Sequence, residues 1–306
     1  MTEEQISKNI NLTLNTFGKR FQKEKEVNFA DLPKFSPWPR RVLGLEEFAK
    51  RIKIREEALR EYDREKWAQA LEKFHNQSWD SFRKFRDSVL GAGYSLKPVF
   101  WKKKLFMLNS NNFSDLFGDL VADLLKRFLP VDTIVELGAG FGSVLLDLAA
   151  RKELSGPRFI GGDLSENGIK LMNALAKRFS INVTSGFFDF TARYPGEIKF
   201  PQDSLIYTSF GLCCLPHIEE VFIQRLIEAK PKFVLHIEPV YPDLEGASLL
   251  DLMVRKYIEI NDYNRNLLQL LKEEERKGEI QICALEKQII GENPLFPASV
   301  IIWRPK

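Results

Sequence analysis

The sequence predicts an α/β protein with a mostly parallel sheet, preceded by a mostly helical N-terminal region. Two observations support this prediction. After residue 130, short apolar runs alternate with amphipathic helical stretches, the pattern of parallel strands joined by crossover helices. Before about residue 110 the chain is charged and aromatic, and its apolar residues recur at helical spacing. We therefore divide the chain into residues 1–110 and an α/β domain of residues 111–306.

The α/β domain is expected to form a seven-stranded sheet. The first five strands are predicted at residues 133–137, 158–162, 181–188, 204–209 and 233–239. Helices are predicted at residues 142–150, 165–179, 217–229 and 248–277. The last two strands, 279–287 and 297–303, have no helix between them. They should therefore pair antiparallel, so that the final strand runs against the rest of the sheet.

The N-terminal region is expected to be helical over most of its length. Residues 31–43 contain three prolines and are predicted to be extended. Helices are predicted over residues 45–76 and 78–90, and another over residues 112–128 that ends before Pro130.

Composition excludes several classes of protein. The formal net charge of the 306 residues is only +3, too small to indicate a nucleic-acid or membrane partner. The three cysteines lack zinc-site spacing and are too few for a disulfide framework, so we expect no metal. No apolar run approaches the roughly 20 residues of a spanning helix, and no signal peptide is evident. We expect a cytoplasmic protein.

A glycine-rich turn, Gly138–Gly142, follows the first predicted strand. Glycines allow the backbone to turn tightly and to approach a ligand closely. The third glycine comes one residue early for a dinucleotide-binding turn, and Ser143 takes that motif's last position. Glu136 precedes the turn, and its carboxylate would repel a pyrophosphate but attract a cationic ligand. The alternative is a tight turn without a ligand.

Two further acids follow the next strands. Asp163 ends the second strand, where a carboxylate can accept hydrogen bonds from ribose hydroxyls, or can serve a helix N-terminus. Asp189 follows the third strand, where it can accept from an adenine amino group while Phe190 covers the base. Open α/β sheets bind ligands at the carboxyl ends of their strands, so the three acids predict one site.

The stretch Glu136–Gly142, followed by Asp163 and Asp189, resembles motifs I, II and III of class I S-adenosylmethionine-dependent methyltransferases. The resemblance covers about residues 112–306, and the final hairpin is similar to that family's sixth and seventh strands. It implies a Rossmann-like fold, S-adenosylmethionine as cofactor and S-adenosylhomocysteine as product. It assigns cofactor binding to Glu136, Gly138, Ala139, Gly140, Gly142, Asp163, Leu164, Asp189, Phe190 and Ser209.

The acceptor has to be predicted from residues after the fourth and fifth strands. His217 precedes a helix, where it can act as a general base or pack against that helix. Glu238 ends the fifth strand on the same side as His236, and other acids follow nearby. An acidic pocket would favour a small cationic acceptor, an amine or a guanidine such as free arginine. Predicted catalytic residues are Glu238 and His217, and predicted substrate contacts are Tyr62, Trp67, Glu238, Tyr241 and Asn293.

Several alternatives stay open. The acceptor can be an oxygen of a small molecule or sugar, or a protein, or the chain can be a non-catalytic S-adenosylmethionine-binding regulator. The Asn/Asp-Pro-Pro-aromatic motif of nucleic-acid amino-methylating enzymes is absent after the fourth strand. The N-terminal region is expected to close over the site as a lid that excludes water. Its candidate lining residues are Tyr62, Trp67, Tyr94 and Trp101. We expect a monomer or a homodimer.

Overall fold

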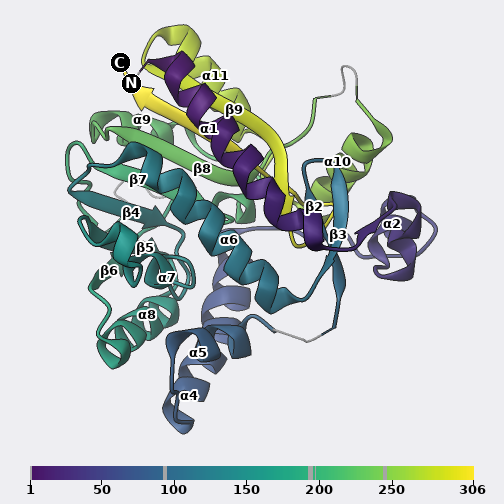
Figure 1. Cartoon of the computed structure of the whole chain (residues 1–306), viewed down its shortest axis with the longest axis horizontal. Coiled ribbons are helices and arrows are strands. Elements are labelled where there is room, and N and C mark those ends of the chain that lie inside the picture. The colour runs from purple at the N-terminus through teal and green to yellow at the C-terminus, as the bar shows by residue number, and fades with distance from the viewer. Residues whose placement is uncertain (1, 92–94, 192–195, 197, 244–246) are drawn as a thin grey trace.

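The computed structural model is a three-layered α/β structure in which helices cover both faces of a ten-stranded sheet (Figure 1). It describes residues 2–91, 95–191, 196, 198–243 and 247–306. The strand order is β1-β3-β2-β9-β10-β8-β7-β4-β5-β6. The strands are β1 (Glu26–Val27), β2 (Lys97–Trp101), β3 (Lys104–Leu108), β4 (Thr133–Leu137), β5 (Arg158–Asp163), β6 (Val183–Phe187), β7 (Leu205–Ser209), β8 (Phe233–Pro239), β9 (Ile280–Gly291) and β10 (Ala298–Pro305).

The predicted α/β class and the antiparallel final strand are confirmed. Strands β4 to β8 pair in parallel, and β10 lies antiparallel between β8 and β9. Each predicted strand of the α/β domain is present, with ends shifted by a few residues.

The predicted number of strands is wrong, because residues 26–108 add three strands to the β9 edge. The sheet is mixed for the same reason, since these strands pair antiparallel. Strands β2 and β3 are joined by Lys102 and Lys103, whose φ angles are +42° and +66°. Two positive φ angles are typical of a two-residue hairpin turn, but Asn-Gly is its usual sequence. A pair of lysines therefore gave no turn signal.

The helices form two layers. They are α1 (Glu3–Gly18), α2 (Trp38–Val42), α3 (Arg55–Ala58), α4 (Ala68–Asn76), α5 (Phe82–Val89), α6 (Ser110–Leu125), α7 (Leu145–Ala149), α8 (Glu166–Phe179), α9 (Glu220–Glu228), α10 (Leu249–Asn261) and α11 (Leu267–Lys277). Helices α1, α6, α7 and α8 pack on one face of the sheet, and α9 and α11 on the other. Each face of the sheet has its own hydrophobic core. Ile134 and Val135, neighbours on β4, pack into different cores, because successive side chains of a strand point to opposite faces.

Four of the predicted segments are wrong in their type or limits. The helix predicted over residues 45–76 begins only at Arg55. Residues 31–43 are not extended: they hold most of a 3₁₀ helix, Phe29–Lys34, and all of α2, because proline is compatible with the first turn of a helix. The helix predicted from residue 142 begins only at Leu145. The long helix predicted over 248–277 is divided into α10 and α11, where Asp262 adopts a left-handed conformation with φ of +53°.

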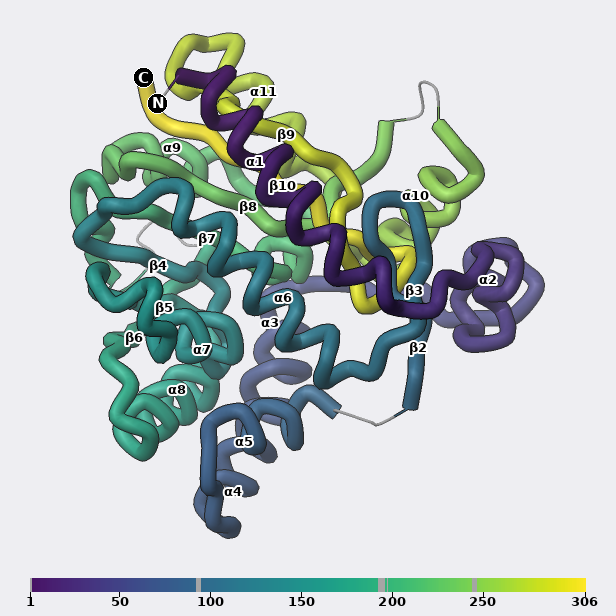
Figure 2. Tube along the Cα trace, in the orientation of Figure 1, coloured from purple at the N-terminus to yellow at the C-terminus, as the bar shows by residue number. Residues whose placement is uncertain are grey.

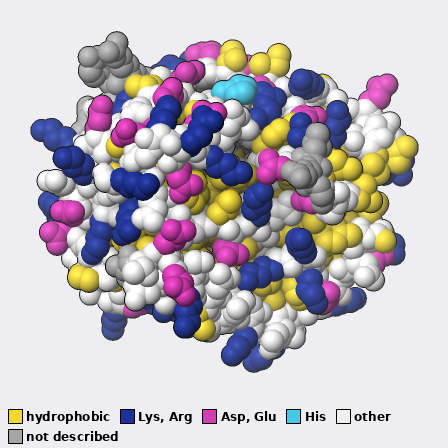
Figure 3. All heavy atoms as spheres, turned by 90° about the horizontal axis from the view of Figure 1, so that it is seen from above, with side chains coloured by type: hydrophobic (Ala, Val, Ile, Leu, Met, Phe, Trp, Pro, Cys, Tyr) yellow, Lys and Arg dark blue, Asp and Glu magenta, His cyan; other side chains and the backbone are white. Residues whose placement is uncertain are grey.

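Two helical segments of the N-terminal region pack against the α/β domain. Helix α1 lies against β9 and α6 (Figure 2). A continuous helical segment, residues 55–76, packs on α8, and its middle part, Leu59–Trp67, is π-helical. The division at residue 110 stays a prediction. In the described ranges, no helix combines the length and the apolar character needed to cross a bilayer. Basic and acidic side chains are interspersed on the face shown in Figure 3.

Candidate functional site

The glycine turn after β4 forms the floor of the candidate site. Gly138, Gly140 and Gly142 all have positive φ, between +57° and +78°, a conformation that disfavours other residues. Neighbouring atoms also leave little room for a side chain at Gly138. A Cβ on Gly138 would lie 3.0 Å from the Cα of Gly211 and 3.1 Å from the ring of Phe190. Gly142 has a packing role instead, because a Cβ there would meet Met172 at 2.8 Å.

Glu136 is buried beneath this turn. Its Oε2 accepts a hydrogen bond of 2.9 Å from the hydroxyl of Tyr207, and its residue exposure is 3%. Burial raises the pKa of Glu136 to about 8, since a charged carboxylate is poorly solvated there. No Lys or Arg among the described residues pairs with it, so a cationic ligand would be stabilised at this position.

Asp163 ends β5 and holds two backbone segments together. One oxygen accepts from the Gly140 N–H at 2.7 Å and the other from the Ser165 N–H at 2.8 Å. Burial raises its pKa above the ordinary value. A carboxylate has about four acceptor positions, so capacity remains for ligand hydroxyls.

Residues from the N-terminal region close over these acids. Asp63 accepts from the Ser165 hydroxyl at 2.7 Å and from the Asn167 N–H at 2.9 Å, so it covers the start of α8. The indole of Trp67 lies so close to Gly140 that a Cβ there would meet it at 3.1 Å. The hydroxyl of Tyr62 accepts from the thiol of Cys214 at 3.4 Å.

Asp189 follows β6 and is paired with an arginine from the same region. Its Oδ2 accepts from Arg55 Nε at 2.9 Å, and its Oδ1 accepts from the N–H and the hydroxyl of Thr191 at 2.8 and 2.7 Å. Burial opposes ionisation, but these hydrogen bonds keep the pKa of Asp189 below its ordinary value. Phe190 turns its ring toward Gly138.

Glu238 holds the loop after β7. Its carboxylate accepts from the N–H groups of Gly211, Leu212 and Cys213, at 2.9, 3.1 and 3.2 Å. The residue is 1% exposed, and burial raises its pKa to about 7. Phe210, just before this turn, has a φ of +53°. Glu238 therefore positions the loop and faces neither cavity described next.

These elements enclose a cavity of about 220 Å³, here called the inner cavity. It brings together predicted site residues from both parts of the chain, namely Tyr62, Trp67, Glu136, Gly138, Ala139, Gly140, Asp163, Leu164, Phe190 and Ser209.

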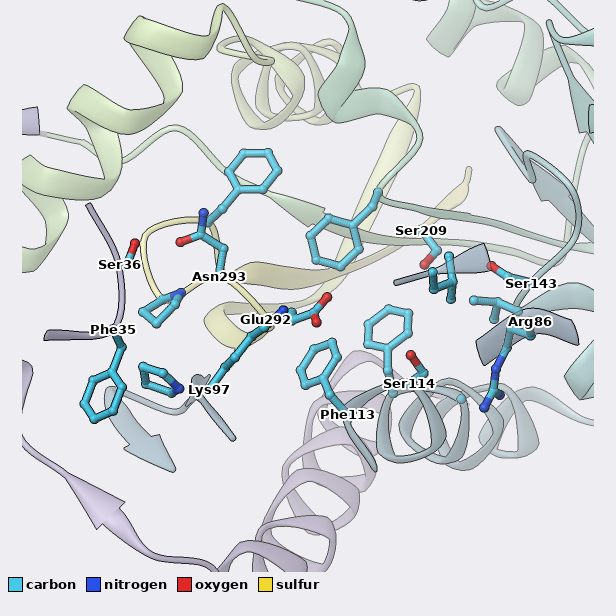
Figure 4. Close-up of a pocket in the computed structure, with 18 of the residues that line it drawn as sticks. Phe35, Ser36, Arg86, Lys97, Phe113, Ser114, Ser143, Ser209, Glu292 and Asn293 are labelled. Atoms are coloured by element: carbon cyan, nitrogen blue, oxygen red, sulfur yellow. The ribbon is translucent and has the colours of Figure 1, made fainter. Parts of the chain in front are cut away.

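A second cavity of about 660 Å³, here called the outer cavity, is drawn in Figure 4. The two share Ser143, Val144, Ser209 and Phe210 as a common wall. The outer cavity is also lined by Phe35, Trp38, Arg86, Lys97, Phe113, Phe117, Asp147, Glu292, Asn293 and Phe296.

Several predicted residues lie elsewhere. His217 is exposed and lines neither cavity. Tyr241 donates to Glu259 at 2.6 Å and borders a separate hollow. Asn293 borders the outer cavity, and its Oδ1 accepts from the Leu295 N–H at 3.0 Å within the turn.

The proposed lid residues Trp101 and Tyr94 do not join the site in the described structure. Trp101 packs against Phe21 at a ring separation of 5.0 Å, and Tyr94 lies outside the described residues. The buried ring of His236 accepts from Trp303 Nε1 at 3.0 Å and contacts the Thr208 hydroxyl at 2.9 Å. Burial lowers the pKa of His236 to about 3.

Sequence reasoning missed Arg55, Asp63 and Phe210. Arg55 and Asp63 pair with groups more than 100 positions away, and no local pattern marks such contacts. A bulky residue before Gly211 gives no sign of its positive φ.

Comparisons with known proteins complete this description. No family model matches the sequence, and no curated protein matches it. Among solved structures, magnesium protoporphyrin IX methyltransferase from Synechocystis PCC 6803, with bound SAH, is similar over 82% of this chain and 100% of its own, with 12% identity and a TM-score of 0.48. The [4+2]-cyclase SpnF is similar over 72% of this chain and 90% of its own, with 13% identity and a TM-score of 0.47. The mitomycin 7-O-methyltransferase MmcR is similar over 89% of this chain and 69% of its own, with 12% identity and a TM-score of 0.46.

The fold itself can be assigned from the sheet. Strands β6-β5-β4-β7-β8 run parallel, and β10 inserts antiparallel between β8 and β9. A glycine turn with three positive φ angles follows the central strand β4. The sheet therefore has the arrangement that the resemblance to class I S-adenosylmethionine-dependent methyltransferases implied, extended at one edge by β1–β3.

Proposed function

We propose that this protein binds S-adenosylmethionine in the inner cavity and transfers its methyl group to a small molecule held in the outer cavity. The observation that carries the proposal is the pair of carboxylates beside a turn that only glycine fits: Glu136, which is buried, and Asp163, which is half-buried. Among the described residues, neither acid has a cationic partner. A ligand with a cationic amino-acid group and a ribose supplies what both lack.

Different residues would bind different parts of the cofactor. Glu136 would attract the cationic end, and Asp163 would accept from ribose hydroxyls. Phe190 would cover the adenine, while Asp189 would accept from its amino group once Arg55 withdraws. The cofactor supplies an electrophilic methyl group. An acceptor lone pair aligned with that methyl group would displace the sulfur, which keeps the electron pair of the broken carbon–sulfur bond, and a hydroxyl or N–H acceptor would release its proton to solvent. The protein's part is to align the two and exclude water.

Residues 55–67 would act as the lid. The inner cavity, at about 220 Å³, is smaller than the roughly 300–1,000 Å³ usual for ligand sites. Trp67 and Tyr62 take up part of its wall. Their segment is held by Arg55–Asp189 and by Asp63 on the start of α8, contacts that a ligand can replace. Opening of this segment would therefore enlarge the cavity for the cofactor.

The acceptor was predicted to be cationic because several acids follow the fourth and fifth strands. Of these, Glu220 pairs with Lys277 and Asp243 with Lys287, and none borders the outer cavity. Glu245 lies outside the described residues. A small amine or guanidine thus stays a proposal from sequence, and methylation at oxygen is an equal alternative.

Calorimetric titration with S-adenosylhomocysteine tests the cofactor. Asp163→Ala should weaken binding by about 1–3 kcal/mol through lost charge-assisted hydrogen bonds. Asp80→Ala is the matched control, because Asp80 is exposed and pairs with the exposed Lys84, and it should bind like the wild type. Absence of binding by the folded wild-type protein would overturn the proposal. Binding without methyl transfer to any small acceptor would instead favour the non-catalytic regulator.

A further inference from the structure

Six of the residues that line the outer cavity are aromatic, and distant parts of the chain contribute them. Phe113 stacks on Phe117 with centroids 6.2 Å apart, and Phe117 meets Phe210 at 5.7 Å. Phe210 in turn lies 6.1 Å from Phe296. The rings come from α6, from the loop after β7 and from the β9–β10 turn, and they form one continuous wall. Such a wall suits a flat apolar ligand, because rings stack on rings.

Phe210 is held at the boundary between the two cavities in an unfavourable conformation. Its φ of +53° lies in the left-handed region, which bulky side chains rarely adopt. The N–H of Phe210 donates to Ile237 O at 3.2 Å, and Glu238 binds the N–H of the next residue. Strain of this kind persists where surrounding contacts enforce it, and it is common at ligand sites. Here it places an aromatic ring on the wall that both cavities share.

Two charged side chains enter the same cavity. Figure 4 shows Lys97, from β2, and Glu292, from the β9–β10 turn, directed into it. In the described part of the chain neither forms an ion pair, and Lys97 has only a 3.4 Å contact with the Ser110 hydroxyl. Arg86 differs, since it is buried and donates to Asp87 and Asp115. Lys97 and Glu292 are thus free to meet polar substituents.

We infer that the acceptor is a planar aromatic molecule carrying at least one hydroxyl group, stacked in the outer cavity beside Phe210 with its polar substituents between Lys97 and Glu292. This inference rests on the proposed function, because it makes the outer cavity the acceptor site. At about 660 Å³ the cavity falls within the range that holds drug-sized ligands. A small guanidinium compound would leave most of the aromatic wall uncovered.

The experiment uses the full chain saturated with S-adenosylhomocysteine and measures binding of 2-naphthol by calorimetry, with L-arginine as the comparison ligand. We expect 2-naphthol to bind at one site per chain and L-arginine to bind at least tenfold more weakly. Phe35→Ala and Glu292→Ala should each weaken 2-naphthol binding, the former by about tenfold through loss of a ring contact. Both positions are exposed, so these variants should fold. Leu249→Ala, at an exposed residue that lines neither cavity, is the control and should change nothing.

The outcomes separate the two proposals. If S-adenosylhomocysteine binds but 2-naphthol does not, or if Phe35→Ala and Glu292→Ala both bind 2-naphthol like the wild type, the aromatic acceptor is wrong and the cofactor site stands. Tighter binding of L-arginine than of 2-naphthol would also overturn the inference and would favour the cationic acceptor. If S-adenosylhomocysteine fails to bind, the proposed function fails first, and the acceptor inference falls with it.

Discussion

The inner and outer cavities share one wall, yet the chain builds them in different ways. The inner cavity is formed mainly by the turns that follow β4, β5, β6 and β7, and residues 58–67 of the N-terminal region complete it. It is polar at its base, with Glu136 buried and Asp163 half-buried. The outer cavity draws on the first 100 residues, α6 and the final hairpin turn, and six of its lining residues are aromatic. The inner cavity therefore depends mostly on local sequence motifs, whereas the outer cavity depends mostly on tertiary packing.

The wall between the cavities should be the most sensitive feature. Glu238→Leu would leave three buried N–H groups without an acceptor. It should lower the free energy of unfolding by about 3 kcal/mol and weaken ligand binding in both cavities. Glu238→Gln, which keeps one acceptor oxygen, should lower the free energy of unfolding by a smaller amount. Urea denaturation measures both variants, and equal stability of Glu238→Leu and wild type would contradict the role of this carboxylate.

A change of pH should affect ligand binding in the inner cavity. Burial raises the pKa of Glu136 to about 8, so the free folded protein holds this proton below that pH, and a cationic ligand favours its release. Binding of S-adenosylhomocysteine should therefore strengthen with rising pH, by at most tenfold per unit, and level off above about pH 8. The stability of the free protein depends on pH in the opposite direction. The contribution of Glu136 to stability is greatest below its unfolded-state pKa and falls as the pH rises toward 8.

Calorimetry in buffers of different ionisation enthalpy measures the proton released on binding. Glu136→Gln should abolish that release. A pH-dependent affinity that is identical in Glu136→Gln and wild type would show that another group titrates.

The smallest effect is expected at the lid. Arg55 is 49% exposed and Asp189 only 6% exposed, so the ion pair is partly screened and should contribute less than about 1 kcal/mol. Arg55→Ala should raise the association rate of S-adenosylhomocysteine a few-fold, because the pair no longer has to break. Arg60→Ala is the control, since Arg60 pairs with Glu57 and Glu65 on the same segment. Stopped-flow fluorescence of Trp67 would report the rate, and a slower association would argue against lid opening.

Prediction from sequence succeeded where a signal is local. The glycines of the turn have the positive φ angles their spacing suggested, and β8 has its predicted limits. It failed where the signal was unusual or remote. The Lys102–Lys103 turn concealed β2 and β3, and the left-handed Asp262 divided the predicted long helix.

Sequence by itself determined the parallel core, the antiparallel final strand and the acids at the strand ends, because hydrophobic periodicity and glycine placement act over a few residues. Only the tertiary structure decided that Glu238 binds backbone N–H groups, that Arg55 pairs with Asp189, and that rings from α6 and from residues 210 and 296 meet in one wall. The physical reason is that burial and contact partners depend on elements packing across the whole chain, and nothing in a local sequence pattern records which distant side chain will arrive there.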